Sequence, residues 1–298
     1  MQPLDRRLFA SSLVRVGAFC VRPDDPRFSD TGPIHAHIFV FPRRSVRITH
    51  EGQPPITADA NVVMYYNKAQ RYRRDAISVD GDRCEWFNVS ESTLVDAIEA
   101  YDPAVRDRPG QPYPFAWGPC PSDVYLAQRD LTQRLSAPTY DGMVVEEAVF
   151  ALLERIVQSV YRGRPCRASR RGDRRRAELA EAARSLVGRR FFQPLSLPQV
   201  AESLKTSPYH LSRVFRTHVG TTLHRYINQL RLRIALERLT EPNIELTELA
   251  LELGFASHSH FTERFRKTFG RTPSVVRAQL KGRPRIRAKI RQRPADSS

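Results

Sequence analysis

Short hydrophobic runs separated by turn-forming residues follow one another between residues 34 and 89. The runs are 34–41, 45–49, 61–66 and 83–89. The segments between them contain Pro-Arg-Arg, Glu-Gly-Gln-Pro-Pro and Asp-Gly-Asp, which favour turns. Short strands at this spacing predict a small barrel or sandwich. Residues 102–122 are rich in proline and predict an irregular connection.

The hydrophobic period changes to 3.6 between residues 142 and 162, which predicts an amphipathic helix. Its apolar stripe contains Val145, Val149, Leu152, Ile156 and Val160, with glutamates elsewhere. Two interpretations are open. The stripe packs against its own domain, or Val145, Val149, Leu152 and Ile156 form a dimer contact.

Residues 196–273 carry one pattern twice, fifty residues apart. The repeated positions are Ser207, His210, Phe215, Arg216 and Gly220, which recur as Ser257, His260, Phe265, Arg266 and Gly270. Each copy predicts a short helix, a tight turn and a second helix with a serine cap and a buried aromatic residue. This is the order of a helix-turn-helix unit, whose second helix enters the DNA major groove.

In the first copy, Ser196 and Gln199 predict a capping box. Lys205 and Thr206 form the turn, and Ser207 caps a helix that begins at Pro208, where a missing N–H costs nothing. On that helix we expect Leu211, Val214 and Phe215 to point inward, and Tyr209, Ser212, Arg213 and Arg216 to point outward.

In the second copy, the turn of Gly254, Phe255 and Ala256 is one residue longer. We expect Phe261 and Phe265 to point inward, and the exposed residues to be His258, Ser259, Thr262, Glu263 and Arg266. Between the copies, residues 223–239 predict one amphipathic helix of about five turns, ~27 Å long. Such a spacer sets the two recognition helices near one turn of DNA apart, ~34 Å.

The outward side chains suit contacts with DNA. Arg213 can bind guanine O6 and N7, and Glu263 can accept a hydrogen bond from cytosine N4. Tyr209 can offer its ring to a thymine methyl group and its hydroxyl to a base or phosphate. We expect the phosphate contacts to come from Thr206, Ser207, Arg216 and Arg266.

The charge is distributed unevenly along the 298 residues. Residues 1–160 contain 18 Lys+Arg and 21 Asp+Glu, whereas residues 161–298 contain 30 and 11, so the net charges are −3 and +19. The second half therefore favours a polyanionic partner. The excess of arginine over lysine fits recognition of phosphate and guanine, but a GC-rich coding genome is the simpler explanation.

Residues 196–277 resemble the DNA-binding domain of the AraC/XylS family of bacterial transcription regulators. The resemblance is carried by residues 207–215, by Leu230-Arg-Leu232 with Ala235, and by residues 254–261, with Phe265, Gly270, Thr272-Pro273 and Arg277 at the end. It implies a seven-helix domain with two helix-turn-helix units. It also implies that bases are read by Tyr209, Ser212, Arg213, His258, Ser259, Thr262 and Glu263. Glu263 departs from the family, in which many members have arginine there.

The resemblance also implies a variable first domain, often a cupin-like barrel, that binds a small effector or forms the dimer. Asp59-Ala-Asn61, Asn67, Tyr72 and Gly81-Asp82 are similar to that barrel. We therefore predict an α+β multidomain protein. Its parts are a cupin-like effector-sensing domain (1–125), a helical dimerisation segment with a basic linker (126–176), the AraC-type domain (177–280) and a disordered basic tail (281–298).

The predicted partners are double-stranded promoter DNA, RNA polymerase and an unknown small-molecule effector or protein, with a homodimer as one option. The N-terminal residues contain no apolar run long enough to predict a signal peptide, and no run of 18 apolar residues predicts a membrane span. The four cysteines are scattered without a CxxC pair. We expect a cytoplasmic, nucleoid-associated bacterial protein.

We expect no enzyme, because catalytic motifs such as HExxH and GxSxG are absent from the sequence, and we expect neither metal nor cofactor. One alternative is a metal-dependent cupin enzyme with a DNA anchor. His35 and His37 motivate it, because alternate residues of a strand share a face. Metal analysis of His35→Ala/His37→Ala tests it. The other alternative is a non-specific architectural DNA binder that uses its basic tails.

Deletion of residues 281–298 separates the specific regulator from the architectural binder. We expect the deletion to remove only a modest part of the DNA affinity, because the two helix-turn-helix units provide the rest. Titration of labelled duplex DNA with full-length and shortened protein measures this. Loss of most of the affinity would favour the architectural binder.

Overall fold

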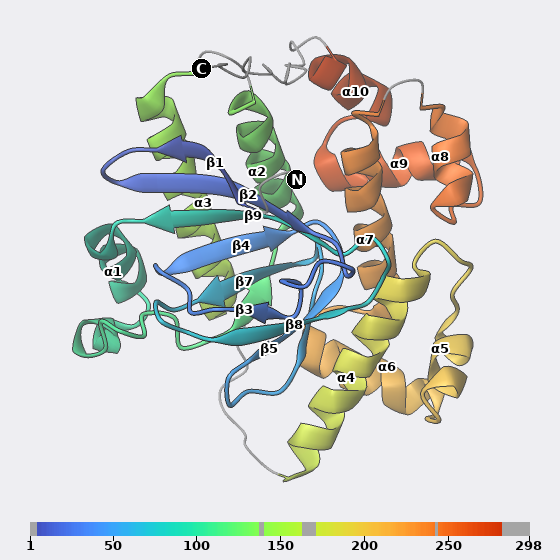
Figure 1. Ribbon diagram of the computed structural model, residues 1–298. Coiled ribbons are helices and arrows are strands. Elements are labelled where there is room, and N and C mark those ends of the chain that lie inside the picture. Colours follow the sequence, from blue (N-terminus) through green and yellow to red (C-terminus); the bar gives the residue numbers. More distant parts are fainter. Residues whose placement is uncertain (1–4, 137–139, 163–170, 242–243, 282–298) are drawn as a thin grey trace, which may run out of the picture.

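The computed structural model describes residues 5–136, 140–162, 171–241 and 244–281 (Figure 1). Residues 163–170 of the predicted linker and residues 282–298 of the predicted tail lie outside this range. The chain order is a β-rich first half followed by a helical second half, which confirms the predicted fold class.

Two antiparallel sheets form the first half and face each other as the halves of an open barrel (Figure 1). The six-stranded sheet has the order β1-β2-β9-β4-β7-β10, and the four-stranded sheet has the order β3-β8-β5-β6. The strands are β1 Asp5–Ala10, β2 Val14–Val21, β3 Asp30–Thr31, β4 Ile38–Pro42, β5 Val46–His50, β6 Ile56–Ala58, β7 Val62–Tyr66, β8 Tyr72–Ala76, β9 Asp82–Val89 and β10 Trp117–Pro119.

The centre of the six-stranded sheet is buried on both faces, and its side chains alternate between two cores. In β4, Phe39 and Phe41 belong to the core beneath the helices, whereas Val40 belongs to the core between the sheets. In β7, Tyr65 belongs to the core beneath the helices, and Met64 belongs to the core between the sheets. The period of two in a strand therefore produces two separate hydrophobic clusters from one sheet.

Helices cover the outer face of the six-stranded sheet. They are α1 Glu91–Glu99, the 3-10 helix η1 Pro103–Asp107, α2 Ser122–Arg134 and α3 Gly142–Arg162. The apolar stripe of α3 packs into this core: Val145, Val149, Leu152 and Ile156 are each at most 3% exposed. The dimer assignment of these four residues is therefore wrong. The sheet of the same chain covers them, so a second copy cannot reach them.

The second half contains helices α4 to α10 (Figure 1). Their bounds are α4 Arg171–Arg190, α5 Leu197–Ser203, α6 Pro208–Val219, α7 Leu223–Arg238, α8 Leu246–Glu252, α9 His258–Phe269 and α10 Pro273–Lys281. Residues 171–176, predicted as linker, are the first turns of α4 instead. The predicted boundaries at 125/126 and 176/177 both fall inside helices, α2 and α4.

The hydrophobic pattern predicts β4, β5, β7 and β9 but misses β1, β2, β3, β6, β8 and β10. The edge strand β1 and its neighbour β2 expose arginines, so they lack a clean apolar alternation. In β8, the charged Arg74 is only 2% exposed because it pairs with Asp82, also buried, at 2.7 Å. A pattern that counts only apolar residues does not detect a strand of this kind.

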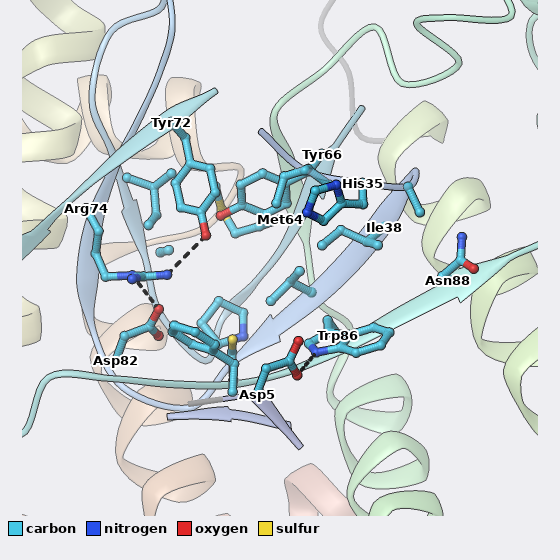
Figure 2. Close-up of a pocket in the computed structure, with 18 of the residues that line it drawn as sticks. Asp5, His35, Ile38, Met64, Tyr66, Tyr72, Arg74, Asp82, Trp86 and Asn88 are labelled. Carbon is cyan, nitrogen blue, oxygen red and sulfur yellow. Dashed lines mark hydrogen bonds and ion pairs between the residues drawn. The ribbon is translucent and has the colours of Figure 1, made fainter. Parts of the chain in front are cut away.

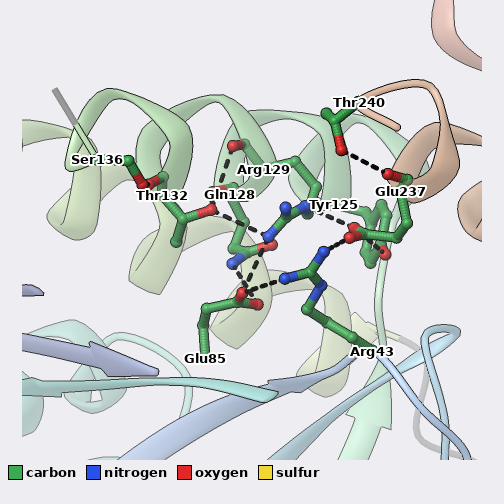
Figure 3. Close-up of polar contacts among 9 residues, drawn as sticks. All are labelled: Arg43, Glu85, Tyr125, Gln128, Arg129, Thr132, Ser136, Glu237 and Thr240. Atoms are coloured by element: carbon green, nitrogen blue, oxygen red, sulfur yellow. Dashed lines mark hydrogen bonds and ion pairs between the residues drawn. The ribbon is translucent and has the colours of Figure 1, made fainter. Parts of the chain in front are cut away.

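A buried ion network joins the β-rich half to α7 (Figure 3). Glu85 of β9 accepts hydrogen bonds from Arg43 and Arg129, each at 3.0 Å, and from Gln128 at 3.2 Å. The same two arginines pair with Glu237 of α7. Burial favours the neutral acid, but Arg129 and Arg43 outweigh it and hold the pKa of Glu85 below its usual value.

We expect Glu85→Gln to lower the free energy of unfolding by about 3 kcal/mol at neutral pH, since it leaves buried guanidinium groups short of a charged acceptor. Because the folded-state pKa is lowered, this contribution is complete above the ordinary value of 4.5 and is lost as the pH falls through the folded value. The difference between wild type and variant should therefore shrink in acid. Urea denaturation at several pH values measures it.

The matched control is Glu99→Gln, which removes an exposed ion pair with Arg106. We expect this control to change stability little. Equal effects of the two variants, or a Glu85→Gln effect independent of pH, would contradict the assigned role of the buried network.

Candidate nucleic-acid interface and cavity

The first helix-turn-helix unit consists of α5 and α6. Ser196 and Gln199 form the predicted capping box at the start of α5. Ser207 caps α6, where its hydroxyl accepts a hydrogen bond from the His210 amide at 3.2 Å. In the turn, Lys205 has a φ of 53°, a left-handed conformation that is strained for a side chain other than glycine.

The second unit, α8 and α9, repeats this construction with the predicted longer turn. Ser257 caps α9 by accepting from the His260 amide at 3.1 Å. Gly254 takes the place of Lys205 and has a φ of 77°. In the two turns, the Thr206 amide donates to the Ala201 carbonyl at 3.0 Å and the Phe255 amide to the Ala250 carbonyl at 2.9 Å.

The predicted inward residues are all buried: Leu211, Val214, Phe215, Phe261 and Phe265 are each at most 3% exposed. Their burial orients the opposite faces of α6 and α9 toward solvent. On α6, Tyr209 is 78% exposed, and Ser212, Arg213 and Arg216 are exposed with it. Of the predicted phosphate contacts in the turn, Thr206 is half-buried, and Ser207 is exposed and also serves as the cap.

The face of α9 differs in part from the prediction. Ser259, Glu263 and Arg266 are exposed, but His258 and Thr262 are half-buried. The Thr262 hydroxyl lies 3.5 Å from Nε2 of His258, within one turn of the helix. The prediction that these two side chains are exposed is therefore wrong, and the exposed polar face of α9 is narrower than that of α6.

Two arginines of α7 point into the protein. Arg231 donates to the carbonyls of Phe191, Gln193 and Gly254 at 2.7 to 2.8 Å and thereby holds the second turn in place. Arg233 is 1% exposed and donates to the carbonyls of Ala60 and Cys120. Net charge alone assigns these arginines to DNA, whereas the structure uses them as internal cross-links.

A cavity of about 450 Å³ lies between the two sheets (Figure 2). Apolar residues from both sheets line it, together with the rings of Phe19, Tyr66, Tyr72 and Trp86. The apolar residues of the four-stranded sheet are Val46, Ile48 and Ala58. The volume falls within the ~300–1,000 Å³ that is usual for small-molecule sites.

Several polar side chains of the cavity pair with one another. Arg74 pairs with Asp82 and donates to the Tyr72 hydroxyl at 3.1 Å (Figure 2). Burial raises the pKa of Asp82, and the positive charge of Arg74 opposes that rise. At the mouth, Asp5 accepts from the Trp86 indole at 2.7 Å, and Arg7 and Arg15 are exposed lining residues.

The two candidate metal histidines do not share a strand face. Both precede β4, which begins at Ile38. His35 is exposed and lines the cavity, whereas His37 is 3% exposed and its Nδ1 accepts from the Lys68 amide at 3.1 Å. Burial lowers the pKa of His37. Within the described part of the chain, no group of three or more His, Cys, Asp or Glu side chains is arranged to hold a metal ion.

Similarity to known proteins is concentrated in the second half. A helix-turn-helix domain family model matches residues 200–279. Regulatory protein SoxS of Salmonella typhimurium is 39% identical over 88 residues, which are 30% of this chain and 82% of SoxS. The XylDLEGF operon transcriptional activator 3 of Pseudomonas putida is 40% identical over 85 residues, which are 28% of this chain and 26% of that protein.

Among solved structures, ToxT from Vibrio cholerae O395 aligns with 91% of this chain and 100% of its own, at 12% identity and a TM-score of 0.35. None of the helices in the described residues is long and apolar enough to cross a membrane.

The two turns predict opposite responses to substitution. A Cβ on Gly254 would lie 2.7 Å from Nη2 of Arg231, and its φ is positive, so Gly254→Ala should lower the free energy of unfolding by about 1–3 kcal/mol. Lys205→Gly should raise it by up to about 1 kcal/mol, because glycine relieves the left-handed strain. Calorimetric unfolding of the full chain measures both.

Gly220→Ala is the control that introduces left-handed backbone strain without a steric clash. Gly220 has a φ of 77°, but nothing lies within 4 Å of an added Cβ. We expect Gly220→Ala to be less destabilising than Gly254→Ala. A Lys205→Gly variant less stable than wild type would contradict the strain assigned to the first turn.

Proposed function

The chain belongs to the AraC/XylS family of transcription regulators, and we propose that it binds promoter DNA sequence-specifically through α6 and α9. In this proposal the two recognition helices enter successive major grooves on one side of the duplex. The observation that carries it is the repeated construction of the two units, each with a serine cap, a left-handed turn residue and a buried aromatic core.

The connecting helix α7 suits this geometry. Its 16 residues span roughly 24 Å at 1.5 Å per residue. Leu223, Ile227, Leu230 and Leu236 are buried in the core that both units share. A helix fixed in this way holds the two units at one separation, so DNA is bound by a rigid pair of helices and not by two independent ones.

The two helices have unequal roles in the proposal. Tyr209, Ser212 and Arg213 read bases from α6, which presents a broad exposed face. Ser259 and Glu263 read bases from the narrower face of α9, where His258 and Thr262 are half-buried and contribute at its edge. Arg216 and Arg266, one or more turns further along each helix, bind phosphates together with Thr206 and Ser207.

Control by a small effector at the first domain is the second part of the proposal. The cavity between the sheets supports it, because its volume and apolar walls suit a small molecule and its exposed mouth provides access. The effector-sensing part then comprises residues up to 162 and the DNA-binding part residues 171–281. RNA polymerase is the proposed protein partner, and the position of the binding site relative to polymerase sets activation or repression.

We expect Arg213→Ala to cost about 1–3 kcal/mol of binding free energy on the preferred sequence and to relax selectivity at one base pair. Arg216→Ala, the matched control on the same helix, should weaken all sequences alike and reduce the salt dependence of binding. Fluorescence anisotropy with duplexes that vary at single positions, measured across salt concentrations, distinguishes the two. If Arg213→Ala weakens every sequence equally, Arg213 binds a phosphate and reads no base.

A further inference from the structure

The edge strand β6 connects the cavity to the DNA-binding half. β6 lies at the end of the four-stranded sheet and pairs on one side with β5, where Thr57 is opposite Arg47. Its other side therefore has backbone groups without a strand partner. When another element covers such an edge, it must supply hydrogen-bond partners, because unpaired N–H and C=O groups are costly to bury.

Two side chains of α4 cover this edge. The Thr57 amide donates to Oε2 of Glu181 at 2.8 Å, and Nη2 of Arg184 donates to the Thr57 carbonyl. Glu181 and Arg184 are one helical turn apart and also pair with each other. They bind both backbone polar groups of Thr57, its N–H and its C=O, as a neighbouring strand would.

The contact continues into α7 through the residues that follow β6. Asp59 is 0% exposed and accepts from the Tyr226 hydroxyl, which in turn accepts from Nε of Arg184 at 3.0 Å. The Asn61 amide side chain donates to the Tyr226 carbonyl at 3.1 Å. Arg233 donates to the Ala60 carbonyl. The segment 57–61 is thus docked on α4 and α7 by buried polar groups.

Ala58 belongs to this segment, and its side chain faces the cavity. It is 1% exposed, lines the cavity and is opposite Val46, another lining residue. The groups of β6 that bind α4 are backbone groups of Thr57 at the strand edge, whereas the side chain of Ala58 leaves the plane of the sheet toward the cavity. Residues 57–61 therefore dock on α4 and α7, and Ala58 among them also forms part of the cavity wall.

We propose that residues 56–61 transmit occupancy of the cavity to the DNA-binding half. An occupant that presses on Ala58 displaces β6 and loosens its hold on α4 and α7. The response is switch-like, because Arg184 and Asp59 are buried charges that must keep their partners or become hydrated. This inference rests on the proposed effector site and adds the route by which that site acts.

The test is hydrogen–deuterium exchange, read by mass spectrometry, on the full chain without DNA. Ala58→Leu places a larger side chain in the cavity from β6 and so fills part of it. Ile38→Phe, the matched control, places a larger side chain in the same cavity from the start of β4. We expect Ala58→Leu to speed exchange at least threefold in residues 177–190 and 224–233, and Ile38→Phe to leave both helices unchanged. Unchanged exchange in Ala58→Leu, or an equal increase in both variants, would overturn the proposal.

A second pair of variants perturbs the docking contacts at α7 and leaves the side chains that line the cavity unchanged. Tyr226→Phe removes the hydroxyl between Asp59 and Arg184, whereas the control Tyr125→Phe removes one that donates to Glu237 at 3.0 Å. Because coupling is reciprocal, Tyr226→Phe should speed exchange in residues 46–58 around the cavity, and Tyr125→Phe should not. A change confined to α4 and α7 would overturn transmission. Neither result depends on DNA binding, so failure of the proposed function would appear separately, in the Arg213 measurements.

Discussion

Buried arginines that bind backbone carbonyls hold the two halves of this protein together. A guanidinium group without access to water must find acceptors, and Arg184, Arg233 and Arg231 find theirs on segments distant in sequence. Arg184 fastens α4 to β6, and Arg233 fastens α7 to the loop after β6. Arg231 fixes the turn of the second helix-turn-helix unit. The orientation of α6 and α9 therefore depends on internal contacts outside the proposed DNA interface.

This constraint changes how the charge of the chain is interpreted. The second half has a net charge of +19, but part of its arginine content is internal and is matched by carbonyls or by Glu181. The arginines of the proposed DNA interface are exposed instead: Arg213 and Arg216 on α6 and Arg266 on α9. Internal cross-linking is thus a third reason for arginine in this sequence, beside nucleic-acid recognition and codon composition.

Sequence periodicity was sufficient for the helix-turn-helix units, because caps, turns and inward aromatic residues depend on local rules that hold within ten residues. It was insufficient for β8 and for the role of the stripe on α3. Arg74 is buried through a partner on another strand, and Val149 faces a sheet formed some sixty residues earlier. Asp59 and Asn61 marked a resemblance to the family barrel, but their contact with Tyr226 spans more than 160 residues. Pairings of that range leave no periodic trace.

The central claim is that one rigid pair of unequal recognition helices reads promoter DNA. Selection of ligands from a random duplex library by the full chain, followed by sequencing, tests it most directly. The account predicts two enriched blocks whose centres are about ten base pairs apart, with the block read by α6 more strongly constrained than the block read by α9. Enrichment of no sequence, with binding that depends on salt but not on base order, would contradict it.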